Sequence, residues 1–333
     1  MPLRTITALN RPSAPSGARP TITNALKLDS KAELDLLVQR LLAPAASIPP
    51  KYFYDALGST LYNAIVLTEE YYPTRTEAAI HQRYRSEIAA AIGVGKQFVD
   101  LGSGDSVKAE KWFEALKPSR YVAVDISESA VIDALSRLAG NPHAPELAGL
   151  ITDFSRVLDV QAVMDDGATL FFYPGSSIGN FMPDEASWFL KQVAAHRRTN
   201  QCGLLIGIDL KKDEANLEAA YDDALGVTAS FNRNVLMHVN RLLGSNFSLD
   251  DWRHYACYDA AFGRIEMHLE ARQDTTVNLR GEERKFRAGE RIHTENSYKY
   301  SLPEFEELLR SAGFAQTRSW VDEQNKFAVF YAQ

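Results

Sequence analysis

Short apolar runs recur along the middle of the chain, with amphipathic stretches between them. The runs do not alternate with polar residues, which is typical of strands buried on both faces of a parallel sheet. The stretches between them place apolar residues at helical spacing, such as Trp112, Phe113 and Leu116. Strands that alternate with helices predict an α/β fold with a doubly wound sheet. The expected strands are 98–101, 121–124, 150–152, 169–173 and 204–208.

The pattern changes after residue 209 and returns near residue 301. Ser301 and Glu304 form a capping-box pattern, which predicts the start of a helix there. We therefore expect residues 210–300 to be an insertion in the α/β core. The expected later elements are a helix through Val239, strands at 265–269, 277–279 and 283–286, a helix that ends near Gly313, and an antiparallel hairpin of 316–321 and 327–331.

The first 28 residues carry basic side chains and no acid, and several prolines interrupt any helix there. Ser30 and Glu33 then form a capping box that opens a helix to Leu42. We expect two domains behind a flexible arm. The arm is 1–29, an α+β substrate-binding domain comprises 30–75 and 210–300, and the α/β core comprises 76–209 and 301–333.

A strand, a glycine turn and a helix follow one another at 98–116, the order of a cofactor-binding corner. Gly102 and Gly104 let the backbone pass close to a ligand, because no Cβ stands in the way. Asp125 ends the next strand, where a carboxylate can accept hydrogen bonds from ribose hydroxyls. Asp153 and Phe154 follow the third strand, where an acid and an aromatic ring can hold an adenine base.

These three features recur together in S-adenosylmethionine-dependent methyltransferases. The third glycine of the dinucleotide pattern would fall at Val107, which argues against a nicotinamide cofactor. Three alternatives stay open: three unrelated strand ends, a nicotinamide-dependent oxidoreductase, and a non-catalytic module with a relic cofactor site.

Two further segments carry candidate substrate residues. The loop after the fourth strand contains Gly175 for close backbone approach and Asn180, whose amide both donates and accepts hydrogen bonds. It is otherwise an ordinary loop with Asn180 as a turn former. The segment 51–62 is rich in tyrosine, including Tyr54 and Tyr62. Buried tyrosine hydroxyls need partners, so this segment is either plain core or the wall of a pocket.

Composition narrows the class of partner. The formal net charge is −7, so no basic surface for nucleic acid is expected. Cys202 and Cys257 are too few and too far apart for a disulfide framework or a zinc site, and we expect no metal. No apolar run approaches the ~18 residues of a membrane helix. We expect a cytoplasmic monomer that binds neither nucleic acid nor membrane.

Several long and unusual stretches make the chain resemble one family over roughly residues 30–333, the histidine Nα-methyltransferases of ergothioneine biosynthesis. The resemblance implies a class I methyltransferase core, a substrate domain, and transfer of methyl groups from S-adenosylmethionine to the α-amine of L-histidine, giving trimethylhistidine. An alternative substrate is another aromatic amino acid such as tryptophan. The matching stretches are Tyr52–Ser59, Glu70–Ala78, Leu101–Gly104, Gly175–Asn180, Tyr221–Asn234, Arg264–Met267 and Thr294–Ser297.

The resemblance also implies residue roles. In the substrate site, Tyr71, Asn180 and Tyr221 would hold the amine and carboxylate, with Gly175 in the same site, Tyr54 beside the amine, Glu295 and Ser297 on the imidazole, and Met267 lining its pocket. Tyr54, Asn180 and Tyr221 would act in catalysis. The cofactor residues would be Tyr62, Gly102, Lys108, Asp125, Asp153 and Phe154. The chain departs from the family at Tyr62, where Phe is expected, and at Asn296, where an apolar residue is expected.

The proposed imidazole contacts have a simple geometric basis. Glu295 and Ser297 stand two residues apart, so on a strand they share one face. A carboxylate accepts from an imidazole N–H, and a serine hydroxyl donates to or accepts from the other ring nitrogen. The alternative is that Glu295 forms a surface ion pair, which contributes little.

Overall fold

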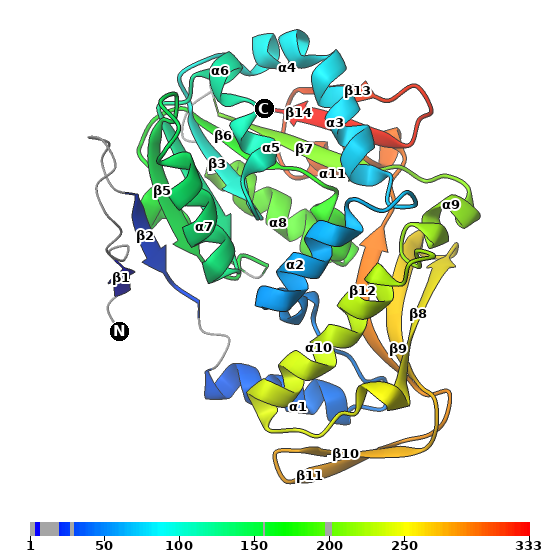
Figure 1. The fold of residues 1–333 in the computed structure, drawn as a ribbon. Coiled ribbons are helices and arrows are strands. Elements are labelled where there is room, and N and C mark those ends of the chain that lie inside the picture. The colour runs from blue at the N-terminus through cyan, green and yellow to red at the C-terminus, as the bar shows by residue number, and fades with distance from the viewer. Residues whose placement is uncertain (1–3, 7–19, 27–29, 156, 197–201) are drawn as a thin grey trace. The chain divides into compact units, whose positions relative to one another are not determined.

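The computed structural model describes residues 4–6, 20–26, 30–155, 157–196 and 202–333 (Figure 1). The chain divides into two compact units, each assembled from separate segments. The first unit comprises Met1–Leu26, Pro73–Lys211 and Tyr300–Gln333. The second unit comprises Lys27–Tyr72 and Lys212–Lys299.

The first unit is built on a mostly parallel sheet with the strand order β1-β2-β5-β4-β3-β6-β7-β14-β13. Strands β2 to β7 run parallel, and β14 and β13 return antiparallel as a terminal hairpin. The predicted doubly wound sheet with a terminal hairpin is confirmed. The strands are β1 (Arg4–Ile6), β2 (Thr21–Asn24), β3 (Gln97–Leu101), β4 (Arg120–Asp125), β5 (Glu146–Ile151), β6 (Thr169–Tyr173), β7 (Gly203–Asp209), β13 (Thr317–Val321) and β14 (Phe327–Ala332).

Helices cover both faces of this sheet (Figure 1). Neighbouring strand residues point to opposite faces, so Val99 joins the core that contains Phe189 of α8, while Phe98 joins the core that contains Val131 of α7. The helices of the first unit are α3 (Pro73–Arg83), α4 (Arg85–Ile92), α5 (Val107–Glu110), α6 (Phe113–Leu116), α7 (Glu128–Leu138), α8 (Pro183–Ala195) and α11 (Leu302–Ser311), with short 3-10 turns η2 (Gln161–Val163) and η3 (Ser177–Asn180).

The N-terminal segment departs from the expected flexible arm where the structure describes it. Strand β2 pairs in parallel with β5 and extends the sheet, and β1 pairs antiparallel with β2. Ile22 of β2 is 2% exposed and joins the core around Leu135. Such backbone pairing and burial order this part of the segment, so the prediction is wrong for β2. Residues 1–3, 7–19 and 27–29 lie outside the described residues.

The second unit packs helix α10 on one face of the antiparallel sheet β12-β9-β8. Val235 and Leu236 of α10 contact a core that contains Met267, Leu269 and Ile292 of the sheet. The elements are α1 (Lys31–Leu42), η1 (Pro50–Phe53), α2 (Ala56–Ile65), α9 (Glu214–Ala219), α10 (Val227–Leu243), η4 (Leu249–Asp251), β8 (Trp252–Asp259), β9 (Arg264–Ala271), β10 (Thr275–Leu279), β11 (Glu282–Phe286) and β12 (Arg291–Tyr298).

Caps predicted from the sequence begin their helices as expected. The Ser30 hydroxyl accepts from the Glu33 amide at α1, and Ser301 with Glu304 forms the full capping box of α11. Gly58 in α2 is required by packing, because a Cβ there would lie 1.7 Å from the Phe53 carbonyl oxygen. Among the described residues, no helix combines the length and the apolar character needed to cross a membrane.

Candidate active site

The glycine turn after β3 forms a tight, pre-organised corner. Gly102 has φ of 71° and Gly104 has φ of 50°, a region that suits glycine. The Gly102 amide donates to the Val124 carbonyl at 2.8 Å, which ties the turn to β4. A Cβ at either glycine would have no neighbour within 4 Å, so open space lies beside this backbone. The predicted helix behind the corner forms as two short helices, α5 and α6.

Asp125 at the end of β4 is held by two backbone amides. Gly104 N donates to its Oδ2 at 2.8 Å, and Ser127 N donates to its Oδ1 at 2.9 Å. Burial raises the pKa of Asp125, and the two amides act against that rise. Each carboxylate oxygen keeps a further acceptor position. The carboxylate therefore has a fixed orientation and spare capacity, as a binder of paired hydroxyls requires.

Asp153 and Phe154, which were predicted to hold an adenine base, lie after β5. Asp153 Oδ1 accepts from the Ser155 amide at 3.0 Å and from its hydroxyl at 2.5 Å. The Phe154 ring lies 6.0 Å from the rings of Tyr173 and Phe189, partly buried against the core of the first unit. The core thus fixes one side of the ring.

Glu77 of α3 links two predicted site residues, and the sequence analysis did not single it out. It is 1% exposed, and its Oε2 lies 2.7 Å from Lys108 Nζ. Its Oε1 accepts from the Gly175 amide at 2.7 Å. Burial opposes ionisation, yet Lys108, His81 and the Gly175 amide hold the pKa of Glu77 below its ordinary value. One buried carboxylate therefore holds both the lysine behind the glycine corner and the loop after β6.

The loop after β6 carries Asn180 at the end of the turn η3. Ser176 precedes the turn with φ of 60°, and its hydroxyl accepts from the Asp209 amide at the end of β7 at 2.8 Å. Asn180 is partly exposed, whereas its neighbours Ile178 and Gly179 are buried. The loop is thus anchored at the carboxyl edge of the sheet, where ligands of such sheets bind.

In the second unit, four tyrosines form a row of rings in edge-to-face contact. The ring centres of Tyr54 and Tyr62 lie 6.1 Å apart, those of Tyr62 and Tyr71 6.5 Å, and those of Tyr71 and Tyr221 6.4 Å. Phe231 of α10 supports the row, with its ring 6.1 Å from that of Tyr54. Burial and the neighbouring Tyr62 and Tyr221 raise the pKa of Tyr71 well above 10, so this phenol is neutral at physiological pH.

Helix α10 holds Tyr221 and the sheet in place through one buried amide. Asn232 Nδ2 donates to the His268 carbonyl at 2.9 Å and lies 2.8 Å from His254 Nδ1. The other ring nitrogen of His254 lies 2.8 Å from the Tyr221 carbonyl oxygen. Asp223 caps α10 by accepting from the Thr228 amide at 2.7 Å. Asn232 and Asp223 therefore have structural roles around Tyr221 and at the start of α10.

Glu295 and Ser297 lie on the inner face of β12, as their spacing predicted. Glu295 stands directly opposite Met267 of β9, so the carboxyl and the thioether are cross-strand neighbours. Glu295 is 7% exposed, Ser297 3% and Met267 2%. Burial raises the pKa of Glu295 to about 8, against the lowering effect of Lys299. The alternative of a surface ion pair is wrong, because Glu295 is buried.

Ser297, Tyr221 and Lys299 form a triangle of hydrogen bonds. Ser297 Oγ lies 2.7 Å from Tyr221 Oη. Lys299 Nζ donates to Ser297 Oγ at 2.9 Å and to Tyr221 Oη at 3.1 Å. Lys299 was not among the predicted site residues, because a single lysine beyond the Thr294–Ser297 stretch carries no local pattern.

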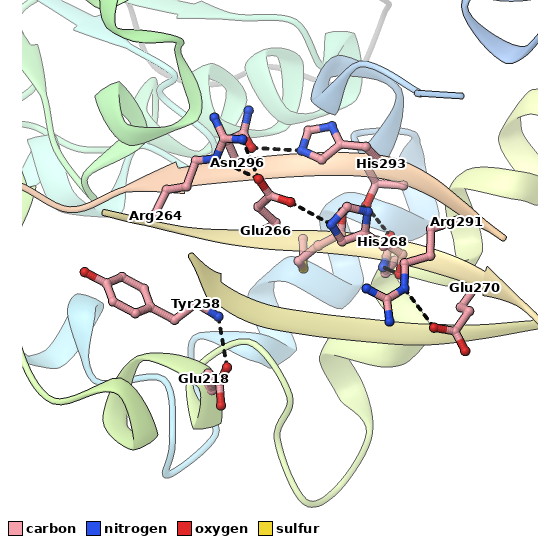
Figure 2. Close-up of polar contacts among 12 residues, drawn as sticks. Glu218, Tyr258, Arg264, Glu266, His268, Glu270, Arg291, His293 and Asn296 are labelled. Carbon is pink, nitrogen blue, oxygen red and sulfur yellow. Dashed lines mark hydrogen bonds and ion pairs between the residues drawn. The ribbon is translucent and has the colours of Figure 1, made fainter. Parts of the chain in front are cut away.

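The outer face of the same sheet carries a separate polar network (Figure 2). Arg264 Nε donates to Glu266 Oε1 at 2.8 Å, and His268 Nε2 lies 2.9 Å from Glu266 Oε2. Asn296 belongs to this face, with its Oδ1 2.9 Å from His293 Nε2, so it does not share the side of Glu295 (Figure 2). The potential ligand atoms of Cys257, Glu266 and His268 lie within 4.8 Å of one another. Both Glu266 oxygens are already bonded, and we assign no metal there.

The comparisons with known proteins now decide the family. The family described as histidine-specific methyltransferase, SAM-dependent, matches residues 33–333. The chain belongs to this family. The histidine N-alpha-methyltransferase of Mycolicibacterium smegmatis is 38% identical over 321 residues, which cover 94% of this chain and 98% of that relative.

Two further matches are less similar or cover less of the other protein. Ergothioneine biosynthesis protein 1 of Neurospora crassa is 30% identical over 305 residues, which cover 89% of this chain and 34% of that relative. A solved S-adenosylmethionine-dependent methyltransferase from Clostridium acetobutylicum has a TM-score of 0.44 and 14% identity, and the match covers 83% of this chain and 96% of that one.

The residues predicted for this methyltransferase fall into two groups. The first unit holds Gly102, Lys108, Asp125, Asp153, Phe154, Gly175 and Asn180. The second unit holds Tyr54, Tyr62, Tyr71, Tyr221, Met267, Glu295 and Ser297. Tyr62, expected near the cofactor, lies in the tyrosine row beside Tyr54 and Tyr71.

Proposed function

We propose that this protein transfers methyl groups from S-adenosylmethionine to the α-amino group of L-histidine, giving trimethylhistidine for ergothioneine biosynthesis. The observation that carries the substrate is the pair Glu295 and Ser297, buried on one face of β12 opposite Met267. Family membership and the names of the relatives support the reaction and the pathway. We further propose that the first unit supplies most of the cofactor contacts and the second unit most of the amino-acid contacts.

The first unit fits the cofactor. Open space lies beside Gly102 and Gly104, and Asp125 presents a carboxylate fixed by two amides. We assign the ribose hydroxyls to Asp125 and the adenine to Asp153 and Phe154. Gly102 and Lys108 serve the remainder of the cofactor, with Tyr62 proposed from the resemblance. When bound, S-adenosylmethionine supplies an activated methyl group on a sulfonium.

The protein's own task is then alignment of a neutral amine. In-line positioning lowers the barrier by ~7–11 kcal/mol. An α-amino group has a pKa near ~8, so a fraction is neutral at physiological pH without a strong base. Asn180 and Tyr221, with Tyr71 and Gly175, hold the amino and carboxylate groups, and Tyr54 lies beside the amine. The methylated cation keeps no N–H donors, and tyrosine rings accept it through cation–π contacts of ~0.5–2 kcal/mol.

Glu295 and Ser297 together contact both ring nitrogens of the imidazole. A neutral imidazole has one donor and one acceptor nitrogen, and Ser297 and Glu295 face these two kinds of atom. Because burial raises the pKa of Glu295 to about 8, the carboxyl is protonated in the empty site at neutral pH. One proton is then held between Glu295 and the ring. An indole has a single ring N–H and no ring acceptor, so it satisfies only one of these two groups, which disfavours tryptophan.

Mass spectrometry of products tests the proposal. Histidine, tryptophan and tyrosine are each incubated with the protein and S-adenosylmethionine, and the methyl groups added to each are counted. We expect trimethylhistidine as the main product. Preferential methylation of tryptophan or tyrosine would overturn the assignment to histidine. Monomeric state and cytoplasmic location stay predictions from the sequence, as does the lack of nucleic-acid and membrane partners.

A further inference from the structure

Lys299 is a buried lysine beside the proposed imidazole contacts. It is 2% exposed, and its Nζ lies 4.7 Å from the centre of the Tyr221 ring. An ammonium carries three donors and no acceptor. Its bonds to Ser297 Oγ and Tyr221 Oη therefore use one acceptor position on each hydroxyl oxygen. A buried charge needs such partners, because leaving it unpaired is costly.

The hydrogen bond between the two hydroxyls can then run in either direction. They lie 2.7 Å apart, so one donates to the other. When Ser297 donates to Tyr221, Ser297 has one acceptor position left for an N–H of a ligand. When Tyr221 donates to Ser297, Ser297 keeps its own proton for an acceptor atom of a ligand. Each hydroxyl has one proton and two acceptor positions, and Lys299 already occupies one position on each.

We infer that Lys299 is a positioning residue that couples recognition of the substrate carboxylate to recognition of the imidazole. The inference rests on the proposed function. A carboxylate only accepts, so its binding to Tyr221 requires Tyr221 to donate outward. Ser297 must then donate to Tyr221 and accept from an imidazole N–H. Because Lys299 also donates to Ser297 Oγ, the imidazole N–H occupies the remaining acceptor position of Ser297.

The same ammonium acts on the other edge of the ring. Its charge lowers the pKa of Glu295, which burial raises. Glu295, Ser297 and Lys299 lie at alternate positions along one segment, and Tyr71 is a further group whose pKa responds to Glu295. Lys299 therefore influences both imidazole contacts without contacting the ring itself.

The test compares Lys299→Met with Lys299→Gln, Ser297→Ala and the double variant Lys299→Met/Ser297→Ala. Lys51→Met is the matched control, because Lys51 is a largely buried lysine of the same unit, paired with Glu33. Lys299→Met is expected to raise KM for histidine about 10- to 150-fold, the range for lost bonds to a charged group. S-adenosylhomocysteine affinity should stay within about 2-fold of wild type, and Lys51→Met should keep the wild-type KM.

Two readouts separate positioning from general packing. The effect of Lys299→Met should shrink in the Ser297→Ala background, because the lysine acts in part through that hydroxyl. The high-pH fall in histidine binding should move to higher pH in Lys299→Met, because loss of the ammonium raises the pKa of Glu295. An unchanged KM in Lys299→Met, or an effect that adds fully to Ser297→Ala, overturns the inference.

Folding and the proposed function are checked separately. If Lys299→Met does not bind S-adenosylhomocysteine, Lys299→Gln decides in its place, because its shorter neutral amide also weakens the triangle. A wild-type KM in that variant counts against the positioning role. Wild-type protein is assayed first. If it does not methylate histidine, the proposed function is wrong, and the inference that rests on it is wrong as well. If it does, only the role of Lys299 is at stake.

Discussion

At the scale of single residues, Glu295 has the most informative protonation state. It is 7% exposed, and burial raises its pKa to about 8 from an unfolded value of 4.5. The native protein therefore keeps a proton that the unfolded chain releases. It follows that the native state loses stability as pH rises from about 4.5 through about 8. The two charged or titratable groups identified beside it are Lys299 and Tyr71.

Glu295→Gln is expected to reduce the loss of activity at high pH that ionisation of Glu295 predicts. Once Glu295 ionises, the imidazole must turn an N–H toward it, so Ser297 must donate to the other nitrogen and Tyr221 must donate to Ser297. The substrate carboxylate then loses its donor. We expect kcat/KM for histidine to fall above pH ~8 in wild type, and to fall less in Glu295→Gln, whose amide donates at every pH. Identical profiles for the two proteins would show that Glu295 does not hold the proton.

Asp125 offers a second test at this scale. Its carboxylate is fixed by the amides of Gly104 and Ser127 and keeps further acceptor positions. Asp125→Ala should weaken S-adenosylmethionine binding by ~1.5–3 kcal/mol, the range for hydrogen bonds to charged groups. Asp125→Asn should lose less, because its carbonyl oxygen still accepts. Calorimetric titration measures S-adenosylmethionine binding by both variants. An unchanged affinity in Asp125→Ala would contradict the assignment of the ribose to Asp125.

At the scale of elements, apolar runs located the central strands because both sheet faces are buried. Strand β6 begins and ends where the run at 169–173 does, and β3, β4 and β7 extend the expected strands by one or two residues. Strand β5 begins at Glu146, earlier than expected, because Ala148 and Gly149 lack the bulky side chains that mark a run. A cap recognised from Ser301 and Glu304 needs only local hydrogen bonds, so it was predictable.

Strands β2 and β8 were not predicted from the sequence, and each omission has a physical reason. One face of β8 carries polar residues such as Arg253 and Cys257, so no apolar run marks it. Strand β2 is short and follows a proline-rich segment, and only its pairing with β5 gives it a place. Glu77 and Lys299 escaped because their partners are distant in sequence: Glu77 meets Lys108 and Gly175, and Lys299 meets Tyr221. Such contacts exist only once the elements have packed.

Glu77 makes the attachment of α3 testable. Its two oxygens hold Lys108 and the amide of Gly175, and the side chain is 1% exposed. Glu77→Ala should lower the free energy of unfolding by ~1.5–3 kcal/mol, because bonds to a charged group are lost and the Gly175 amide loses its partner. It should also raise KM for histidine, since the loop that carries Asn180 loses an anchor.

Glu87→Ala is the matched control for Glu77→Ala. Glu87 lies on α4 and pairs with Arg318, with both side chains 52% exposed. Exposed pairs contribute only ~0–1 kcal/mol, so its loss should change neither stability nor KM by much. Denaturant unfolding and steady-state kinetics compare the two variants. Equal effects would show that the buried position of Glu77 has no special role.

At the scale of the whole molecule, the proposed cofactor and substrate groups are divided between two units of one chain. The chain passes from one unit to the other near residues 26, 72, 211 and 299. Two of these crossings lie close to proposed substrate residues: Tyr71 lies two residues before Pro73, and Ser297 lies three residues before Tyr300. Insertion of one unit into the other therefore places substrate groups next to the joints. Neither unit is a continuous stretch of sequence, which is why composition alone did not separate them.

This division predicts two distinct footprints in hydrogen exchange. S-adenosylhomocysteine alone should slow exchange at 98–106 and 121–127 of the first unit, where the glycine corner and Asp125 lie. Adding histidine should slow exchange at Arg291–Tyr298 of the second unit, with the β10-β11 hairpin, which carries no proposed ligand group, as internal reference. A ligand at 100 times its Kd stabilises the bound state by ~2.7 kcal/mol, so openings that release it become about 100-fold rarer. If histidine protected only the first unit, the amino acid would be bound there, and the roles proposed for Glu295 and Ser297 would be wrong.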